Sequence, residues 1–152
     1  MPSTSVASGR TASEIAALAS QLRIAVARTA RTLRREAGEG ITPTLMCALA
    51  TIEHHGPMTV GALAEHEHVT KPTVTRTVHA LVEQGLVIRT TDAGDGRVGW
   101  LALSGEGRRL LHRVRRRKDE YLARRLRGLS PDRIEALQRA AEVLTEIEGS
   151  EA

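Results

Sequence analysis

Apolar residues recur every three or four positions over most of this chain, and this spacing predicts amphipathic helices. Glycine and proline breaks at 38–40, 56–57 and 85 divide the pattern into segments. The first helix is expected to continue to about Arg35 and a later one to about Arg127. The helices are predicted to begin at Thr11, Thr42, Thr59, Thr70, Ser104 and Ser130.

The spacing changes to two after residue 85. Leu86, Ile88 and Thr90 alternate with their neighbours, which predicts a strand. Residues 92–96 are Asp- and Gly-rich, and 98–103 completes a hairpin. The element order therefore predicts a mostly α fold with a small β-hairpin wing.

The helix at each end of the chain carries an apolar stripe, and the neighbouring segments are too short to cover it. The two stripes consist of Ile15, Leu18, Leu22, Ala25 and Leu33, and of Ile134, Leu137, Ala141, Leu144 and Ile147. A second subunit is the simplest cover, so a homodimer is expected. The predicted organisation is a disordered N-terminus at 1–10, dimerisation helices at 11–40 and 105–148, and a winged helix-turn-helix DNA-binding domain at 41–104.

The helix beginning at Thr70 is the second helix of a helix-turn-helix, the element that enters the major groove of DNA. With Val74 facing inward, the helical period turns Pro72, Arg76 and His79 outward, flanked by threonines. Arg76 can bond the O6/N7 edge of guanine with both ends of its guanidinium. A solvated face that touches nothing is the alternative. The predicted DNA-binding residues of this region are Thr70, Lys71, Pro72, Thr73, Thr75, Arg76 and His79.

The hairpin tip carries Asp95 and Arg97 among glycines. A long guanidinium on a narrow loop can enter the minor groove, so Arg97 is also a predicted DNA-binding residue. An ordinary turn with a solvated arginine is the alternative. Trp100 alternates with Leu101 and is expected to face away from the domain core.

These residues resemble the multiple antibiotic resistance regulator (MarR) family of bacterial transcription factors. The resemblance rests on Leu63-Ala64, on Val69 to Arg76, on Leu81 to Val87 with Arg89, and on Asp95-Gly96-Arg97 followed by Leu103-Ser104 and Gly107. It extends over about 13–148.

The resemblance implies a triangular homodimer that binds a pseudo-palindromic operator in double-stranded DNA. It implies a ligand-responsive repressor, released by a small apolar or phenolic ligand between its domains. It also implies that Arg89 pairs with Asp95 and so positions the wing. Gly96 departs from the family, which often has arginine there, and this predicts a weaker or more mobile wing.

Composition agrees with a DNA-binding role. The net charge of +4 favours an anionic partner. No apolar run is long enough for a membrane span, and none has the form of a signal peptide. A bacterial cytoplasmic protein that associates with the nucleoid is therefore expected, without a cofactor.

Other functions remain as alternatives. Histidines 54, 55, 66 and 68 suggest a metal-responsive regulator as one alternative. Their spacing instead favours histidines that are exposed to solvent at helix ends. Cys47 suggests a redox-responsive regulator as a second alternative. The preferred interpretation is that Cys47 is a small buried residue that fills space. A winged-helix protein-interaction module is a third alternative. The basic run at 113–118 is read as a mostly solvated face. No catalytic set is recognisable, so no enzyme is expected.

Overall fold

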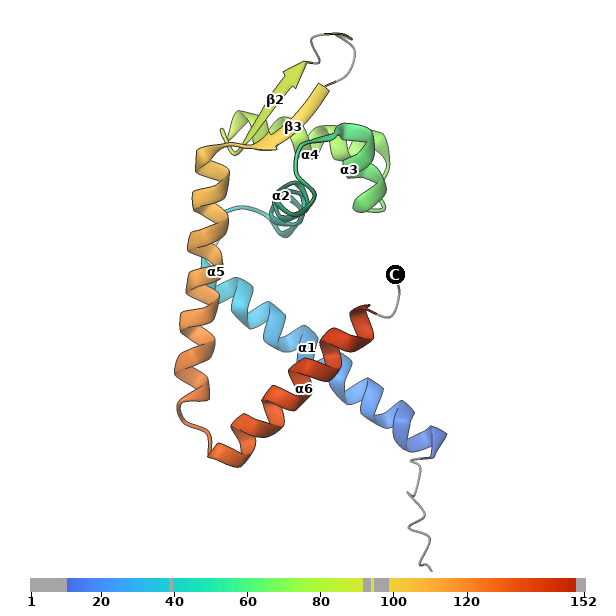
Figure 1. Cartoon of the computed structure of the whole chain (residues 1–152), viewed down its shortest axis with the longest axis vertical. Helices are drawn as coiled ribbons and strands as arrows, with labels where there is room; N and C mark the ends of the chain where they lie inside the picture. The colour runs from blue at the N-terminus through green and yellow to red at the C-terminus, as the bar shows by residue number, and fades with distance from the viewer. Residues whose placement is uncertain (1–10, 39, 92–93, 95–98, 150–152) are drawn as a thin grey trace, which may run out of the picture.

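The computed structural model describes residues 11–38, 40–91, 94 and 99–149. Figure 1 shows the winged helix-turn-helix at one end and the helices α1 and α6 toward the other, with the long α5 running between the two ends. This confirms the mostly α fold with a small β wing. The elements are α1 (Ala12–Ala37), α2 (Pro43–His55), β1 (Met58–Thr59), α3 (Val60–His66), α4 (Lys71–Glu83), β2 (Val87–Thr91), β3 (Gly99–Leu103), α5 (Gly105–Leu126) and α6 (Pro131–Gly149).

Local capping chemistry explains where several helices begin. Thr11 and Glu14 form a reciprocal capping box at the start of α1. The hydroxyls of Thr42, Thr59 and Ser104 each accept the N–H of the third residue of the helix that follows, in α2, α3 and α5. These predicted starts are confirmed.

The sheet contains one strand more than the predicted hairpin. β1 pairs with β3, and β3 pairs with β2, all antiparallel. Met58 lies opposite Leu101, and Val87 lies opposite Leu103. β1 was missed because two residues are too short to show an alternating pattern. Position 98 lies outside the described residues.

One hydrophobic core joins the winged domain to the top of α5. Leu49, Leu63, Leu81 and Leu101 are fully buried there, and Leu111 of α5 packs with them. Trp100 is 38% exposed on the opposite face of the sheet, as its alternation with Leu101 predicts. Helices α2, α3 and α4 are thereby held against the sheet, which fixes the exposed face of α4.

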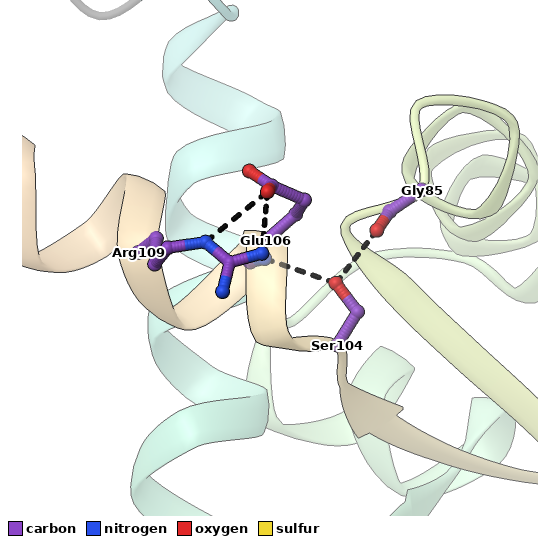
Figure 2. Close-up of polar contacts among 5 residues, drawn as sticks. Gly85, Ser104, Glu106 and Arg109 are labelled. Atoms are coloured by element: carbon purple, nitrogen blue, oxygen red, sulfur yellow. Dashed lines mark hydrogen bonds and ion pairs between the residues drawn. The ribbon is translucent and has the colours of Figure 1, made fainter.

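The junction between β3 and α5 is tied to the end of α4 (Figure 2). The Ser104 hydroxyl donates to the Gly85 carbonyl at 2.6 Å and accepts the Gly107 N–H at 3.0 Å. The Ser104 N–H donates to the Leu86 carbonyl. A Cβ on Gly107 would overlap that same carbonyl oxygen, so only glycine fits. The Leu-Ser-x-x-Gly sequence therefore builds a tight joint.

Two arginines of the basic run on α5 also contact neighbouring helices. Arg117 donates to the carbonyl of Ala37 at 2.9 Å, at the end of α1. Arg115 pairs with Glu53 of α2. Residues 113 and 115–117 are nevertheless exposed, which confirms the prediction of a mostly solvated face. The contacts of Arg115 and Arg117 were not predicted, because they depend on α1 and α2 ending beside this part of α5. No helix within the described ranges has the length and hydropathy to cross a bilayer.

Candidate nucleic-acid interface

Helix α4 has a buried face and an exposed face. Val74, Val78 and Leu81 are buried in the core. Thr77 is also buried, and its hydroxyl donates to the Thr73 carbonyl at 3.2 Å. Because this face is sealed by the other helices and the sheet, the opposite face is the one available to DNA.

The structure brings the predicted residues of this region together. All are exposed, six on α4 and one at its N-cap: Lys71, Pro72, Thr73, Thr75, Arg76 and His79, with Thr70 as the cap. Thr70 differs from the other capping threonines, because its hydroxyl makes no capping bond and lies 3.0 Å from that of Thr73. Arg97 and Asp95 lie outside the described residues.

A hydrogen bond and an ion-pair contact within α4 decide what its exposed groups can offer to a partner. The Thr75 hydroxyl donates to the Lys71 carbonyl at 2.8 Å. Nδ1 of His79 lies 3.3 Å from Oε2 of Glu83, one turn further on. The guanidinium of Arg76 lies between these two pairs in sequence and can only donate hydrogen bonds. The exposed face therefore combines a cation with groups already oriented by the helix.

The turn between α3 and α4 is held by a contact that the sequence did not reveal. Glu67 caps the end of α3, and its carboxylate accepts the hydroxyl of Thr51 from α2 at 2.5 Å. His68 follows with a positive φ of 52°, and the Val69 N–H reaches back to the Ala64 carbonyl. These contacts set the angle at which α4 leaves the turn. A separation of 16 residues between Thr51 and Glu67 leaves no local pattern to find.

The base of the wing places Arg89 against a glycine. A Cβ on Gly99 would lie 2.8 Å from Nε of Arg89 and 3.1 Å from one of its terminal nitrogens. The guanidinium therefore lies across the Gly99 backbone, on the first residue of β3. Sequence reasoning singled out Arg89 but missed Gly99, whose role depends on the pairing of β2 with β3.

The histidines of α2 and α3 meet in space. The rings of His55 and His66 stack with centroids 4.0 Å apart, and His54 lies edge-on to His55 at 4.8 Å. Desolvation, followed by the charges of His66 and His54, lowers the pKa of His55. Within the described residues, no group of three or more His, Cys, Asp or Glu side chains is arranged to hold a metal ion.

Cys47 is exposed, so the prediction of a small buried filler is wrong. It borders a cavity of about 270 Å³ where α1, α2 and α5 approach one another. The helices diverge enough here to leave the thiol uncovered. The cavity is lined by Ala30, Leu33, Arg34, Pro43, Met46, Cys47 and Lys118.

Comparison with known proteins agrees with this geometry. Residues 41–98 match the model of the MarR family. An HTH-type transcriptional regulator of Mycobacterium leprae is 38% identical over 133 residues, which cover 87% of this chain and 93% of the relative. The chain belongs to the MarR family.

Two further transcriptional regulators extend the likeness. The HTH-type transcriptional repressor MdtR of Bacillus subtilis is 32% identical over 67% of this chain and 64% of its own length. A transcriptional regulator from Pseudomonas aeruginosa has a similar structure, with a TM-score of 0.81 at 28% identity over 91% of this chain and 98% of its own. This MarR-family protein is thus a DNA-binding transcriptional regulator with a winged helix.

Proposed function

We propose that this MarR-family regulator is a ligand-responsive repressor that binds a pseudo-palindromic operator as a homodimer. Helix α4 enters the major groove, and the wing enters the minor groove. The observation that carries the proposal is the division of α4 into a core-sealing face and an exposed face bearing Arg76. The relative MdtR, named as a repressor, supports the sign of regulation.

Arg76 tests major-groove reading. Arg76→Ala should lower the preference for the operator over scrambled DNA by about 1–3 kcal/mol per half-site, the value of one bidentate base contact. Arg116→Ala is the control, because it removes an equal charge from an exposed position on α5. Competition gel shifts at one salt concentration measure the preference. An unchanged preference in Arg76→Ala would show that this residue reads no base.

In the wing, we assign Arg97 to the minor groove and Asp95 to a positioning role through Arg89. The orientation of Arg89 across Gly99 supports this, because it fixes the guanidinium at the base of the wing. A double-mutant cycle on operator affinity tests the assignment. The losses of operator binding free energy caused by Arg97→Ala and Asp95→Ala should be non-additive. If the two losses simply add, Asp95 does not position the wing.

The homodimer is supported by apolar surface that one chain leaves open. None of the described residues of α6 is buried, and Leu137, Val143 and Ile147 are 48%, 53% and 59% exposed. An apolar hollow of about 580 Å³ also opens where α5 turns into α6. Ile147→Glu should convert the dimer to a monomer in sedimentation, whereas Glu142→Gln on the same helix should not. A dimer in both variants would count against this interface.

The cavity beside Cys47 is the proposed effector site. Its apolar lining suits a small ring, and Arg34 and Lys118 at its edge suit an acidic or phenolic oxygen. It lies between the terminal helix α1 and the winged domain, so an occupant can alter their relation. Benzoate and phenol are suitable probes. They should weaken operator binding in the wild type but not in Met46→Trp, which fills the cavity; equal weakening in both would place the effector elsewhere.

A further inference from the structure

The exposed face of α4 carries two polar side chains, Thr75 and His79, that each have an acceptor of the same helix beside them. The Thr75 hydroxyl has one hydrogen, and it is donated to the Lys71 carbonyl at 2.8 Å. Turning that hydrogen toward DNA would break the bond. In this arrangement Thr75 offers a partner only its oxygen lone pairs and its methyl group.

His79 lies one turn beyond Thr75 and is oriented in a similar way. Its Nδ1 lies 3.3 Å from Oε2 of Glu83, and a carboxylate can only accept a hydrogen bond. The contact therefore favours the tautomer with hydrogen on Nδ1. In a neutral imidazole this leaves Nε2 with a lone pair and no hydrogen. Residues four apart share one helix face, so Thr75 and His79 present acceptors side by side.

Acceptors on this face suit bases and not the DNA backbone. Phosphate oxygens only accept hydrogen bonds, so an accepting oxygen or nitrogen gains nothing beside them. In the major groove, the exocyclic amino groups of adenine (N6) and cytosine (N4) are the donors, whereas guanine offers the acceptors O6 and N7. Arg76, which only donates, matches guanine.

We propose that Thr75 and His79 form an acceptor patch that reads an adenine or cytosine amino group, next to a guanine read by Arg76. This inference rests on the proposed function, because it requires α4 to lie in the major groove. It assigns to each operator half-site a guanine adjacent to an amino-bearing base. Glu83 is a positioning residue, since it acts by orienting the His79 ring.

Selecting the duplexes that the protein binds from a pool of random DNA sequences identifies the operator sequence. It is run at pH 8, where imidazoles are generally neutral. The wild type should enrich a guanine next to adenine or cytosine in each half-site. Replacing that adenine by purine, or that cytosine by 2-pyrimidinone, removes the amino group alone. Affinity should then fall roughly threefold to tenfold, the value of one neutral hydrogen bond.

The variants separate the acceptor from the shape of the side chain. Thr75→Val keeps the branched shape and removes the oxygen, whereas Thr75→Ser keeps the oxygen and removes the methyl group. Thr75→Val should discriminate less than the wild type between the natural and the deaminated operator, and Thr75→Ser should discriminate about as well as the wild type. His79→Phe, which keeps a ring without nitrogen, should reduce discrimination further when combined with Thr75→Val. Circular dichroism confirms that each variant is folded.

The outcomes are distinct. If selection enriches no sequence, the proposed function fails and this inference fails with it. If a guanine-containing operator emerges but Thr75→Val discriminates like the wild type, only the acceptor patch is wrong. Selection could instead enrich thymine at the neighbouring position, both with the wild type and with Thr75→Val. That result would show that a methyl group of residue 75 contacts the base, and it would overturn the proposal.

Discussion

The side chain of Ser104 makes two hydrogen bonds that together join the winged helix-turn-helix to α5. Its oxygen caps α5 by accepting the Gly107 N–H, and its hydrogen goes to the Gly85 carbonyl just after α4. Ser104 is itself 9% exposed. Substituting alanine removes both bonds without introducing a larger side chain, so the variant measures the joint directly.

The expected loss is larger than that of an ordinary helix cap. Removing a serine N-cap costs about 1 kcal/mol, within a range of about 0.5–2 kcal/mol. The second bond, to the carbonyl of the exposed residue Gly85, adds roughly 0.5–1.5 kcal/mol, because water can replace the lost hydroxyl in the variant. Ser104→Ala should therefore lower the free energy of unfolding by about 1–3 kcal/mol. Thr42→Ala is the matched control, because Thr42 caps α2 by accepting the Leu45 N–H.

Urea denaturation followed by circular dichroism measures both variants. Unfolding of an oligomer depends on its concentration, so all proteins are compared at the same concentration. An unchanged m-value confirms that the same surface is exposed on unfolding. Ser104→Ala should be less stable than Thr42→Ala by about 1 kcal/mol, the net value of the Gly85 bond. Equal losses would refute the idea that this bond contributes to the joint.

Two further predictions concern the wing and the histidine cluster. Gly99→Ala should displace the Arg89 guanidinium and lower operator affinity, because the new Cβ would lie 2.8 Å from Nε of Arg89. Gly61→Ala is the control and should change operator affinity little, because a Cβ has more room there. Equal operator affinities of the two variants would contradict the prediction. The pKa of His55 is lowered in the folded state, so the unfolded chain binds more protons, and stability should fall as the pH drops through the ordinary histidine range near 6.5. His66→Gln should weaken that pH dependence in urea denaturation, and an unchanged slope would exclude the stacked ring as a cause.

The sequence predicted features that depend on nearby residues. The caps at Thr42, Thr59 and Ser104 each need only the first turn of the helix that follows. The period of α4 likewise identified its inward and outward faces. Spacing of this kind is a property of the helix itself, so it survives in any fold that contains the helix.

The features that were missed depend on contacts between distant segments. Thr51 meets Glu67, and His55 meets His66, only because α2 packs against α3. The exposure of Cys47 is a property of how closely three helices approach, which composition cannot give. The same is true of Arg117, whose partner at the end of α1 is 80 residues away.

The contacts of α5 also explain how a change near α1 can reach α4. At one end, Ser104 and Gly107 hold α5 against the residues that follow α4, and no space remains for a Cβ at Gly107. Further along, Arg117 holds the end of α1, and Arg115 holds α2. A packed joint of this kind passes on a tilt and does not absorb it. An occupant of the Cys47 cavity that favours one crossing angle of α1 and α5 would therefore favour one orientation of α4. The shift in that equilibrium is set by the difference in the occupant's affinity for the two crossing angles.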